Sequence, residues 1–341
     1  MRQTIPHGLF WWFGHLASPL TKTFLTLGSN LSLPSLCSAL VIAVGFMVLR
    51  RSGRSNLKIR VLRRALFPRR LFVSASSRAD LGFLLMNMFV IAGTIGWAVL
   101  SGSVVADAVR RALTSIMGQR APYSLDPGIW HIVSTVIVFL TYDFAYWLNH
   151  YVSHRIGWLW EFHKVHHTAE VLTPMTNARV HPIDSLVFSN FLAIFLGISN
   201  GILAYCFGKV GTPLTIGGNN ALVIAYAFTF QHLQHSHIWI ATTGRFGRII
   251  FSPAHHQIHH SDARVHFDKN FGACLAVWDW MFDTLYTPSS QRERLTYGCA
   301  SPGVDPHTAV GALLMPFVHS ASRILQPLRR RALLPGFQTR N

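Results

Sequence analysis

Long apolar stretches, separated by short polar and basic segments, dominate the pattern of this chain. Five stretches approach or reach the roughly 20 residues that a helix needs to cross a bilayer. They are Leu31–Leu49, Leu81–Val105, Ile129–Leu148, Leu186–Phe207 and Leu214–Phe230. The last two predict a hairpin that turns at Gly208–Pro213 and either crosses the membrane or stays half-buried in it. The pattern therefore predicts an all-α protein, a polytopic membrane helical bundle.

Composition favours a membrane protein over a soluble one. Only 13% of the 341 residues are charged, whereas about a quarter is usual in soluble domains. The formal net charge of +17 could indicate nucleic acid, but basic loops on one side of a membrane explain it better. The sequence contains no DNA- or RNA-binding motif. Its four cysteines are far apart and form no CxxC, so neither a cysteine zinc site nor a disulfide framework is indicated.

The loop Arg50–Asp80 contains ten arginines and lysines and a single acid, Asp80. By the positive-inside rule this loop is expected to be cytoplasmic. Counting spans from it places the end of the third stretch, with His150, on the same side. If the hairpin crosses out and back, the histidines after residue 230 and the basic tail Arg329–Arg331 are cytoplasmic too. The sequence therefore predicts a helical, histidine-rich cap on the cytoplasmic face.

Three histidine motifs set the expected chemistry of this cap. They are HYVSH with His150 and His154, HKVHH with His163, His166 and His167, and HQIHH with His256, His259 and His260. Residues three and four apart share one face of a helix, with Cβ atoms about 5–6 Å apart. We therefore expect each motif to direct two or three imidazoles to one point. Imidazole at this density suits zinc, copper, iron or nickel, which predicts an enclosed site for more than one metal ion.

Four further histidines are candidates with open roles. The segment QHLQHSH contains His232, His235 and His237, of which one is expected to be a ligand and the others to orient ligands or line a cleft. His181 precedes a proline, which disfavours helix at that position. It is therefore either a metal ligand or a loop histidine with a structural hydrogen bond.

Asp143 is an acid within the third apolar stretch, seven residues before His150. Acids at membrane depth are costly and usually functional. We expect Asp143 to accept a proton from a ligand imidazole and so to fix the orientation of that ring. The ring is expected to come from HKVHH or HQIHH, because about 10 Å of helix separates Asp143 from His150. The alternative is an ion pair with an arginine inside the bundle.

Missing motifs exclude other classes of enzyme. The sequence has no HExxH, so a zinc metalloprotease would lack its general base. It has neither a GxGxxG dinucleotide fingerprint nor a GxxxxGK[ST] phosphate-binding loop. A membrane metal-binding or metal-transport protein is the alternative from another class. A transporter is expected to place its ligands at midplane depth, whereas these histidines follow the apolar stretches, which favours an enzyme.

The segment Tyr142–Pro288 resembles the sterol desaturase and fatty acid hydroxylase superfamily. The matching pieces are YDFAYWLNHYVSH, LWEFHKVHH, ARVHPID, QHSH, SPAHHQIHH, NFG at Asn270–Gly272, and WDWMFDTLY. The resemblance implies an integral membrane enzyme with a non-haem di-iron centre, which uses O₂ to hydroxylate or desaturate a lipid alkyl chain or a sterol. An ether-lipid monooxygenase or a carotenoid hydroxylase, with similar metal chemistry and another substrate, is the alternative.

The resemblance also implies ligands and cofactors. The implied iron ligands are His150, His154, His163, His166, His167, His256, His259 and His260, with His235 at the family's HSN motif. That motif reads HSH here, so His237 replaces the asparagine, and FDT at Phe282–Thr284 stands where a glycine is usual before the threonine. Two iron ions are expected, which zinc can displace during purification because zinc lies above Fe²⁺ in the Irving–Williams order. Electrons are expected from an external electron-transfer protein or reductase, because no cytochrome domain is fused to the chain.

Three regions are expected on this basis. Residues 1–128 would form a membrane region with two spans and the basic loop, and residues 129–288 the di-iron catalytic region with three spans. Residues 289–341 would form a basic tail. The expected partner is a lipid substrate in the membrane and not a nucleic acid.

Overall fold

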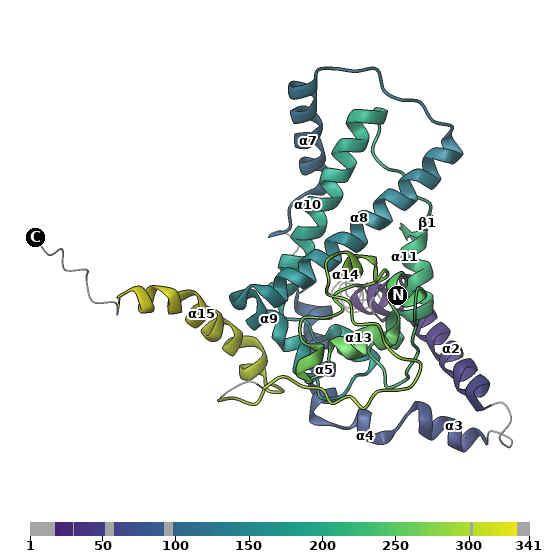
Figure 1. Cartoon of the computed structure of the whole chain (residues 1–341), viewed down its shortest axis with the longest axis vertical. Helices are drawn as coiled ribbons and strands as arrows, with labels where there is room; N and C mark the ends of the chain where they lie inside the picture. Colours follow the sequence, from purple (N-terminus) through teal and green to yellow (C-terminus); the bar gives the residue numbers. More distant parts are fainter. Residues whose placement is uncertain (1–17, 30, 52–57, 92–97, 301–302, 333–341) are drawn as a thin grey trace, which may run out of the picture.

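The computed structural model describes residues 18–29, 31–51, 58–91, 98–300 and 303–332, and these residues are mostly helical (Figure 1). The elements are α2 (Leu33–Arg51), α3 (Ile59–Leu66), α4 (Arg69–Phe72), α5 (Ala75–Met86), η1 (Asn87–Ile91), α7 (Gly102–Met117), α8 (Pro127–Arg155), α9 (Gly157–His167), η3 (Pro174–Ala178), α10 (Pro182–Phe207), β1 (Thr215–Ile216), β2 (Asn219–Asn220), α11 (Ala221–Tyr226), η4 (Ala227–Gln231), α12 (His232–Gln234), η5 (Phe246–Arg248), α13 (Pro253–His259), η6 (Arg264–His266), α14 (Val277–Met281), η7 (Val310–Leu314) and α15 (Met315–Ala332). The all-α prediction is confirmed.

Three described helices are long and apolar enough to cross a membrane: Leu33–Arg50 within α2, and the whole of α8 and α10. They coincide with the predicted stretches that begin at Leu31, Ile129 and Leu186. Local signals in the sequence set the ends of these helices. The side chain of Asp126 accepts hydrogen bonds from the first N–H groups of α8, and Gly208, at φ 70°, ends α10 in the left-handed conformation.

Two of the predicted spans are not single helices. Leu81–Val105 is divided between α5 with η1 and the later α7, and residues 92–97 in its middle lie outside the described part of the chain. Leu214–Phe230 begins with the antiparallel β1–β2 pair and becomes helical only afterwards. Gly217 and Gly218, at φ 59° and 81°, occupy the two turn positions that require positive φ. This turn interrupts the apolar run, so the prediction of a spanning helix over Leu214–Phe230 is wrong.

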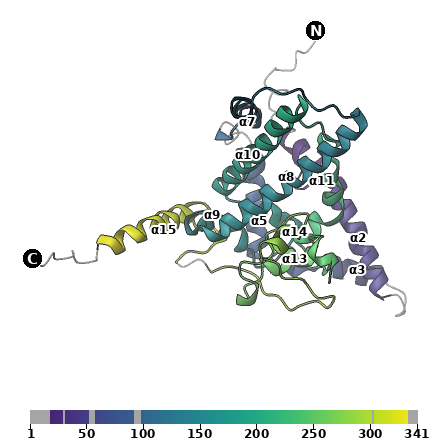
Figure 2. The same cartoon turned by 45° about the horizontal axis from the view of Figure 1, so that its top comes forward.

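Helices α7, α8 and α10 lie side by side in both views, and α15 projects away from the rest (Figures 1 and 2). α7 and α10 approach closely because small residues face the contact. A Cβ atom on Gly201 would lie 2.6 Å from the carbonyl oxygen of Ala106, and one on Gly197 would lie 2.6 Å from Cβ of Val105. Small residues at this spacing are typical of helix pairs within membranes. The end of α8 that is remote from this contact carries the first histidine motif and leads into α9, which carries the second.

Candidate metal centre

The three histidine motifs lie on α8, α9 and α13. Only Ile156 separates α8 from α9, so HYVSH and HKVHH lie on successive helices that meet at a single residue. Ser252 and Pro253 start α13, which carries HQIHH. His235 follows the short helix α12, and α12 packs against α13. The fold therefore brings four segments of the chain, the first and last of them about 100 residues apart, to the end of α8.

The nine histidines that were candidate ligands form two clusters. The first cluster contains His150, His154, His163, His167 and His259, and the second cluster contains His166, His235, His256 and His260. Within each cluster, one ring nitrogen from every residue lies within 4.8 Å of the others. The rings of His167 and His260, with centroids 4.6 Å apart, place the two clusters side by side.

Each motif directs two imidazoles to one cluster, as expected, but HKVHH and HQIHH each direct a third histidine to the other cluster. In HKVHH, His163 and His167 belong to the first cluster and His166 to the second. In HQIHH, His259 belongs to the first cluster and His260 to the second. Consecutive residues on a helix point about 100° apart, so neighbouring histidines reach two different centres. Each of these two helices therefore contributes to both clusters and fixes the separation between them.

Three rings of the first cluster are oriented through Nδ1. The acceptors are the carbonyl oxygen of Phe271 for His150 at 2.9 Å, that of Lys269 for His259 at 2.8 Å, and Oδ2 of Asp184 for His163 at 3.0 Å. Because a carbonyl or carboxylate oxygen only accepts, Nδ1 carries the proton and Nε2 keeps a free lone pair. The Nε2 atoms of these three rings are buried and have no partner among the described residues. Unpaired lone pairs that converge in this way fit a metal ion.

The second cluster is tighter. Nε2 of His235 lies 2.9 Å from Nε2 of His256, 3.1 Å from that of His166 and 3.2 Å from that of His260. Nδ1 of His166 donates to the carbonyl oxygen of Arg179 at 3.1 Å, so Nε2 of His166 has a lone pair. Four nitrogens bound tetrahedrally at about 2.0–2.1 Å from one ion are about 3.3 Å apart. The spacing and chemistry of this donor set therefore fit one metal ion.

Burial keeps these imidazoles neutral. Burial, and after it neighbouring imidazoles, lowers the pKa of His166 and of His259 to about 3. The pKa values of His167, His235 and His260 are lowered well below 6.5, first by burial and then by nearby histidines. Neutral imidazole is the form that binds metals, so no proton has to be displaced from these residues at neutral pH.

Asp143 does not orient an imidazole in this structure. Its carboxylate accepts hydrogen bonds from the backbone N–H groups of Cys274 and Leu275, at 2.9 and 3.2 Å, and from the indole of Trp278 at 2.9 Å. Among the described residues, no imidazole and no arginine donates a hydrogen bond to this carboxylate. Both expected roles of Asp143 are therefore wrong, because both oxygens are used to hold the segment before α14 against α8. Asp184 hydrogen-bonds to the clustered His163 instead, and Asp268 lies 3.9 Å from Nδ1 of His154.

Asp279 has a similar anchoring role. It accepts from the backbone N–H groups of Phe271 and Gly272 at 2.9 and 2.8 Å, and from the indole of Trp147 at 3.1 Å. Burial raises the pKa of Asp279 to about 6, and these hydrogen bonds partly oppose that shift. The carbonyl oxygen of Phe271 in turn accepts from His150. Asp279 therefore positions an acceptor for one ring of the first cluster.

The other candidate histidines lie outside both clusters. His181 accepts a hydrogen bond from the backbone N–H of Ile183 at the start of α10, and its Nε2 lies 3.2 Å from the carbonyl oxygen of Leu313. Of the two expected roles, the structure therefore shows the loop histidine with structural hydrogen bonds and not the metal ligand. Nε2 of His237 donates to the carbonyl oxygen of Ala65 at 2.6 Å. His232 is 1% exposed, and neither of its ring nitrogens has a partner among the described residues.

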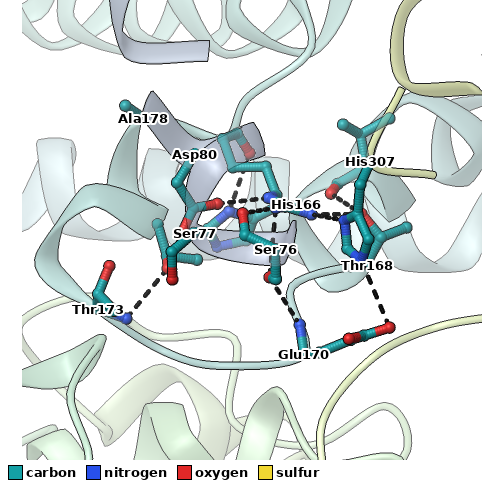
Figure 3. Close-up of polar contacts among 12 residues, drawn as sticks. Ser76, Ser77, Asp80, His166, Thr168, Glu170, Thr173, Ala178 and His307 are labelled. Atoms are coloured by element: carbon teal, nitrogen blue, oxygen red, sulfur yellow. Dashed lines mark hydrogen bonds and ion pairs between the residues drawn. The ribbon is translucent and has the colours of Figure 1, made fainter. Parts of the chain in front are cut away.

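A buried ion pair behind the second cluster was not predicted as part of the site. Arg179 and Asp80 are both fully buried, with Nε of the arginine 2.6 Å from Oδ1 of the aspartate. The guanidinium also donates to Thr168 Oγ1 at 3.0 Å and to the carbonyl oxygen of Ser76 at 2.5 Å. Figure 3 shows Asp80, Ser76 and Thr168 drawn together with His166. The carbonyl group of Arg179 holds Nδ1 of His166, so this pair supports a candidate ligand.

One signal for this pair was present in the sequence. Asp80 is the only acid in a strongly basic segment, and the structure uses it to neutralise a buried arginine. Asp184 is much nearer to Arg179 in the sequence than Asp80 is. In the structure Asp184 contacts His163 and Arg179 contacts Asp80.

Comparisons with known proteins agree with this arrangement. Residues 135–284 match the family model described as fatty acid hydroxylase. Alkylglycerol monooxygenase from Caenorhabditis elegans is 26% identical over 145 residues, which cover 42% of this chain and 25% of that protein. The ornithine lipid hydroxylase OlsE from Rhizobium tropici is 28% identical over 163 residues, covering 48% of this chain and 45% of OlsE. Human lathosterol oxidase is 25% identical over 169 residues, or 48% of either chain.

No solved structure matches the chain. The chain spans between a quarter and about half of the length of the curated relatives that it matches. Residues 135–284, which match the family model, contain the histidine motifs that build the two clusters.

Proposed function

We propose that this chain, which belongs to the sterol desaturase and fatty acid hydroxylase superfamily, is a membrane-bound oxidoreductase that hydroxylates or desaturates a lipid with O₂ and external electrons. The observation that carries the proposal is the pair of adjacent clusters of buried, neutral imidazoles. The three helices that are long and apolar enough to cross a membrane support a substrate dissolved in the bilayer. The lipid-modifying relatives support a lipid as the substrate.

An ether-lipid monooxygenase is a second candidate, because several relatives are named alkylglycerol monooxygenase. A metal transporter fits less well. A transporter is expected to bind its ion near the middle of the membrane, whereas His163, His166 and His167 lie on α9, beyond the end of the long helix α8. The carotenoid hydroxylase alternative gains no support from these relatives.

Two iron ions are the proposed cofactors, one in each cluster. Iron bound there would supply the reduction and activation of O₂. The donor set fits because imidazole binds iron and zinc alike, so zinc in a purified sample would be consistent with the same site. The nine histidines of the two clusters would hold both ions, and an external electron-transfer protein or reductase would supply the electrons.

The residues around the histidines have two tasks in this proposal. Asp184 and the carbonyl oxygens of Phe271 and Lys269 hold protons on Nδ1, which keeps Nε2 free for binding. Aromatic rings exclude water from the first cluster. The ring of Phe271 lies 5.0 Å from that of His154, and the ring of Trp160 lies 4.7 Å from it. A dry, preorganised site protects reactive species from unproductive reaction with water.

The function is tested by metal analysis and lipid analysis together. The full chain, purified in detergent from iron-supplemented cells, is expected to contain two metal ions per molecule. Membranes that contain the chain and a reductant are expected to convert a lipid only when O₂ is present. Labelled ¹⁸O₂ should appear in the lipid if the reaction is hydroxylation and in water alone if it is desaturation. His131→Ala, at an exposed site remote from both clusters, serves as the control. Fewer than one ion per chain and no O₂-dependent product would refute the proposal.

Orientation in the membrane is a separate proposal with its own test. We expect the basic segment and both clusters to face the cytoplasm, because arginine and lysine are concentrated next to α2. Cysteines introduced at Arg60 and at Ser289, in a chain without its native cysteines, should react with an impermeant maleimide only after the cells are opened. A cysteine at Lys209, beyond the far end of α10, should react in intact cells. The reverse pattern would overturn the cytoplasmic placement.

A further inference from the structure

Helix α15, together with the end of the turn η7 before it, presents an apolar stripe to the outside of the molecule. The side chains of this stripe are large and each is between 44% and 59% exposed: Leu314, Phe317, Val318, Ile324 and Leu325. At 100° per residue they fall within an arc of about 120°, which is the width of the apolar face of an amphipathic helix. In a soluble domain such a stripe faces the core, whereas here it faces away from the protein.

The opposite side of α15 packs against α9. Pro316 and Ser320 are buried on this side. Nδ1 of His319 and Nε of Arg323 lie 3.6 and 3.2 Å from the carboxylate oxygens of Glu161, which is 2% exposed. The protein therefore holds α15 by its polar side. Turning the helix to bury the stripe would break these contacts and leave a buried carboxylate with fewer partners, which is costly.

Contacts with two spanning helices fix the level of α15. The ring of Phe317 lies 5.4 Å from that of His181, the residue that caps the start of α10. A Cβ atom on Gly157, two residues after the end of α8, would lie 3.8 Å from Cδ of Arg323. α15 therefore begins where α8 ends and α10 starts, and in both views it projects sideways from α9 at that end of the spans (Figures 1 and 2).

This level corresponds to the headgroup layer of a bilayer. α8 has 29 residues, so it is about 43 Å long at 1.5 Å per residue. A bilayer is about 30 Å thick across its hydrocarbon core and about 40–45 Å thick with its headgroups. A helix of this length that is centred in the bilayer ends among the headgroups. The apolar segment Val310–Leu325 is itself too short to cross the core, which needs roughly 20 residues.

The charge of α15 fits an anionic surface. The helix contains Arg323 and, in its last turn, Arg329–Arg331, and the sequence has no acid after Asp305. Two copies of the chain packed stripe to stripe would bring these arginines together without an acid on either helix to pair with them. Anionic phospholipids supply the opposite charge, and basic residues next to such a membrane are attracted to it.

We propose that α15 is an interfacial helix, with its apolar stripe among the acyl chains at one surface of the membrane and its basic end at the headgroups of anionic phospholipids. Helices of this type lie in the plane of the membrane with the apolar face about 5–10 Å deep. The contact lies outside residues 135–284, which match the family. Because the polar side of α15 holds Glu161 on α9, membrane contact also fixes the helix that carries HKVHH. This placement is independent of the reaction at the metal centre.

A fluorescent label on single cysteines tests the placement without any turnover. The full chain without its native cysteines, in nanodiscs of phosphatidylcholine and phosphatidylglycerol, carries the label at Ile324→Cys on the stripe or at Ser322→Cys as the matched control. Ser322 is exposed and points about 160° away from Ile324 on the same helix. The label at Ile324 should be quenched by lipids with a nitroxide near the top of the acyl chain and shielded from iodide in the water. The label at Ser322 should show the reverse.

Two outcomes would overturn the placement. If iodide quenches both labels alike, water covers the stripe. If the label at Ile324 is shielded from iodide but is not quenched by the nitroxide lipids, a second copy of the chain covers the stripe instead of the membrane.

Charge variants test the preference for anionic lipid. Arg329→Gln/Arg330→Gln should lower the ratio of immersed to water-exposed label at Ile324 by about fivefold for each arginine. Omitting phosphatidylglycerol should lower the ratio for the parent chain and have less effect on this variant. Arg245→Gln/Arg248→Gln removes the same charge from exposed positions outside α15 and should leave the ratio unchanged. If the two double variants behave alike, the proposed contact with anionic phospholipids is refuted.

Discussion

His259→Ala and His260→Ala are expected to remove metal from different clusters, although the two residues are neighbours in the sequence. His259 belongs to the first cluster and His260 to the second, and the clusters share no residue. Each variant should therefore retain about one of the two ions. Lipid turnover should fall by more than the roughly 10–100-fold that is typical when a group that only orients a ligand is lost. Elemental analysis of the purified variants and O₂-dependent product formation give the two readouts.

The pattern across variants separates a two-centre site from a single polynuclear one. The double variant His259→Ala/His260→Ala should lose both ions, and His131→Ala should keep both. Iron spectroscopy should show a magnetically isolated ion in each single variant. If either single substitution releases both ions, the clusters are not independent sites. If neither substitution releases an ion, these two histidines are not ligands.

The histidine spacing predicted which residues gather at this site, but it did not predict how they are divided between the two clusters. Periodicity alone suggests that HKVHH presents one face. Whether His166 and His167 serve one centre or two depends on what surrounds α9 on each side. Here α8 supplies His150 and His154 to the first cluster, whereas the segment after α12 supplies His235 to the second, and tertiary packing sets both contacts.

Asp143 shows the same limit for a single polar residue. Its position inside an apolar stretch correctly marked it as a buried group with a specific partner. The partners are backbone N–H groups and an indole more than 130 residues further along the chain. Backbone donors leave no trace in a sequence, because every residue except proline has one. The sequence therefore pointed to an imidazole as the partner of Asp143, whereas the actual partners are backbone groups and an indole.

The fold itself could be predicted where a stretch is long, apolar and free of turn residues. This holds for α8 and α10, whose ends carry Asp126 and Gly208 as capping residues. It fails for Leu214–Phe230, where average hydrophobicity hides the Gly217–Gly218 turn. Turn chemistry at two residues outweighed the apolar character of most of the other fifteen, because two glycines with positive φ suit a tight hairpin and weaken a helix.

Asp80→Asn is expected to lower the metal content of the second cluster more than that of the first. Asp80 neutralises the buried guanidinium of Arg179, and the carbonyl group of Arg179 holds Nδ1 of His166. Leaving one member of a buried ion pair unpaired typically costs about 3–5 kcal/mol. The turn η3 should therefore shift, and His166 should lose its fixed orientation. Turnover is expected to fall about 10–100-fold, as is typical when a group that orients a metal ligand is removed.

Selective metal loss distinguishes this positioning role from general destabilisation. A merely structural role would lower the melting temperature and release metal from both clusters in parallel. The positioning role predicts that cobalt, used as a spectroscopic probe, still binds the first cluster of Asp80→Asn while the signal from the second is weakened. Asp80→Glu, which restores the charge, should recover part of that signal. Asp107→Asn, which alters an exposed acid 3.9 Å from Arg110 on α7, is the matched control and should change neither cluster. Equal loss from both clusters in Asp80→Asn would mean that the ion pair holds the fold together without orienting His166.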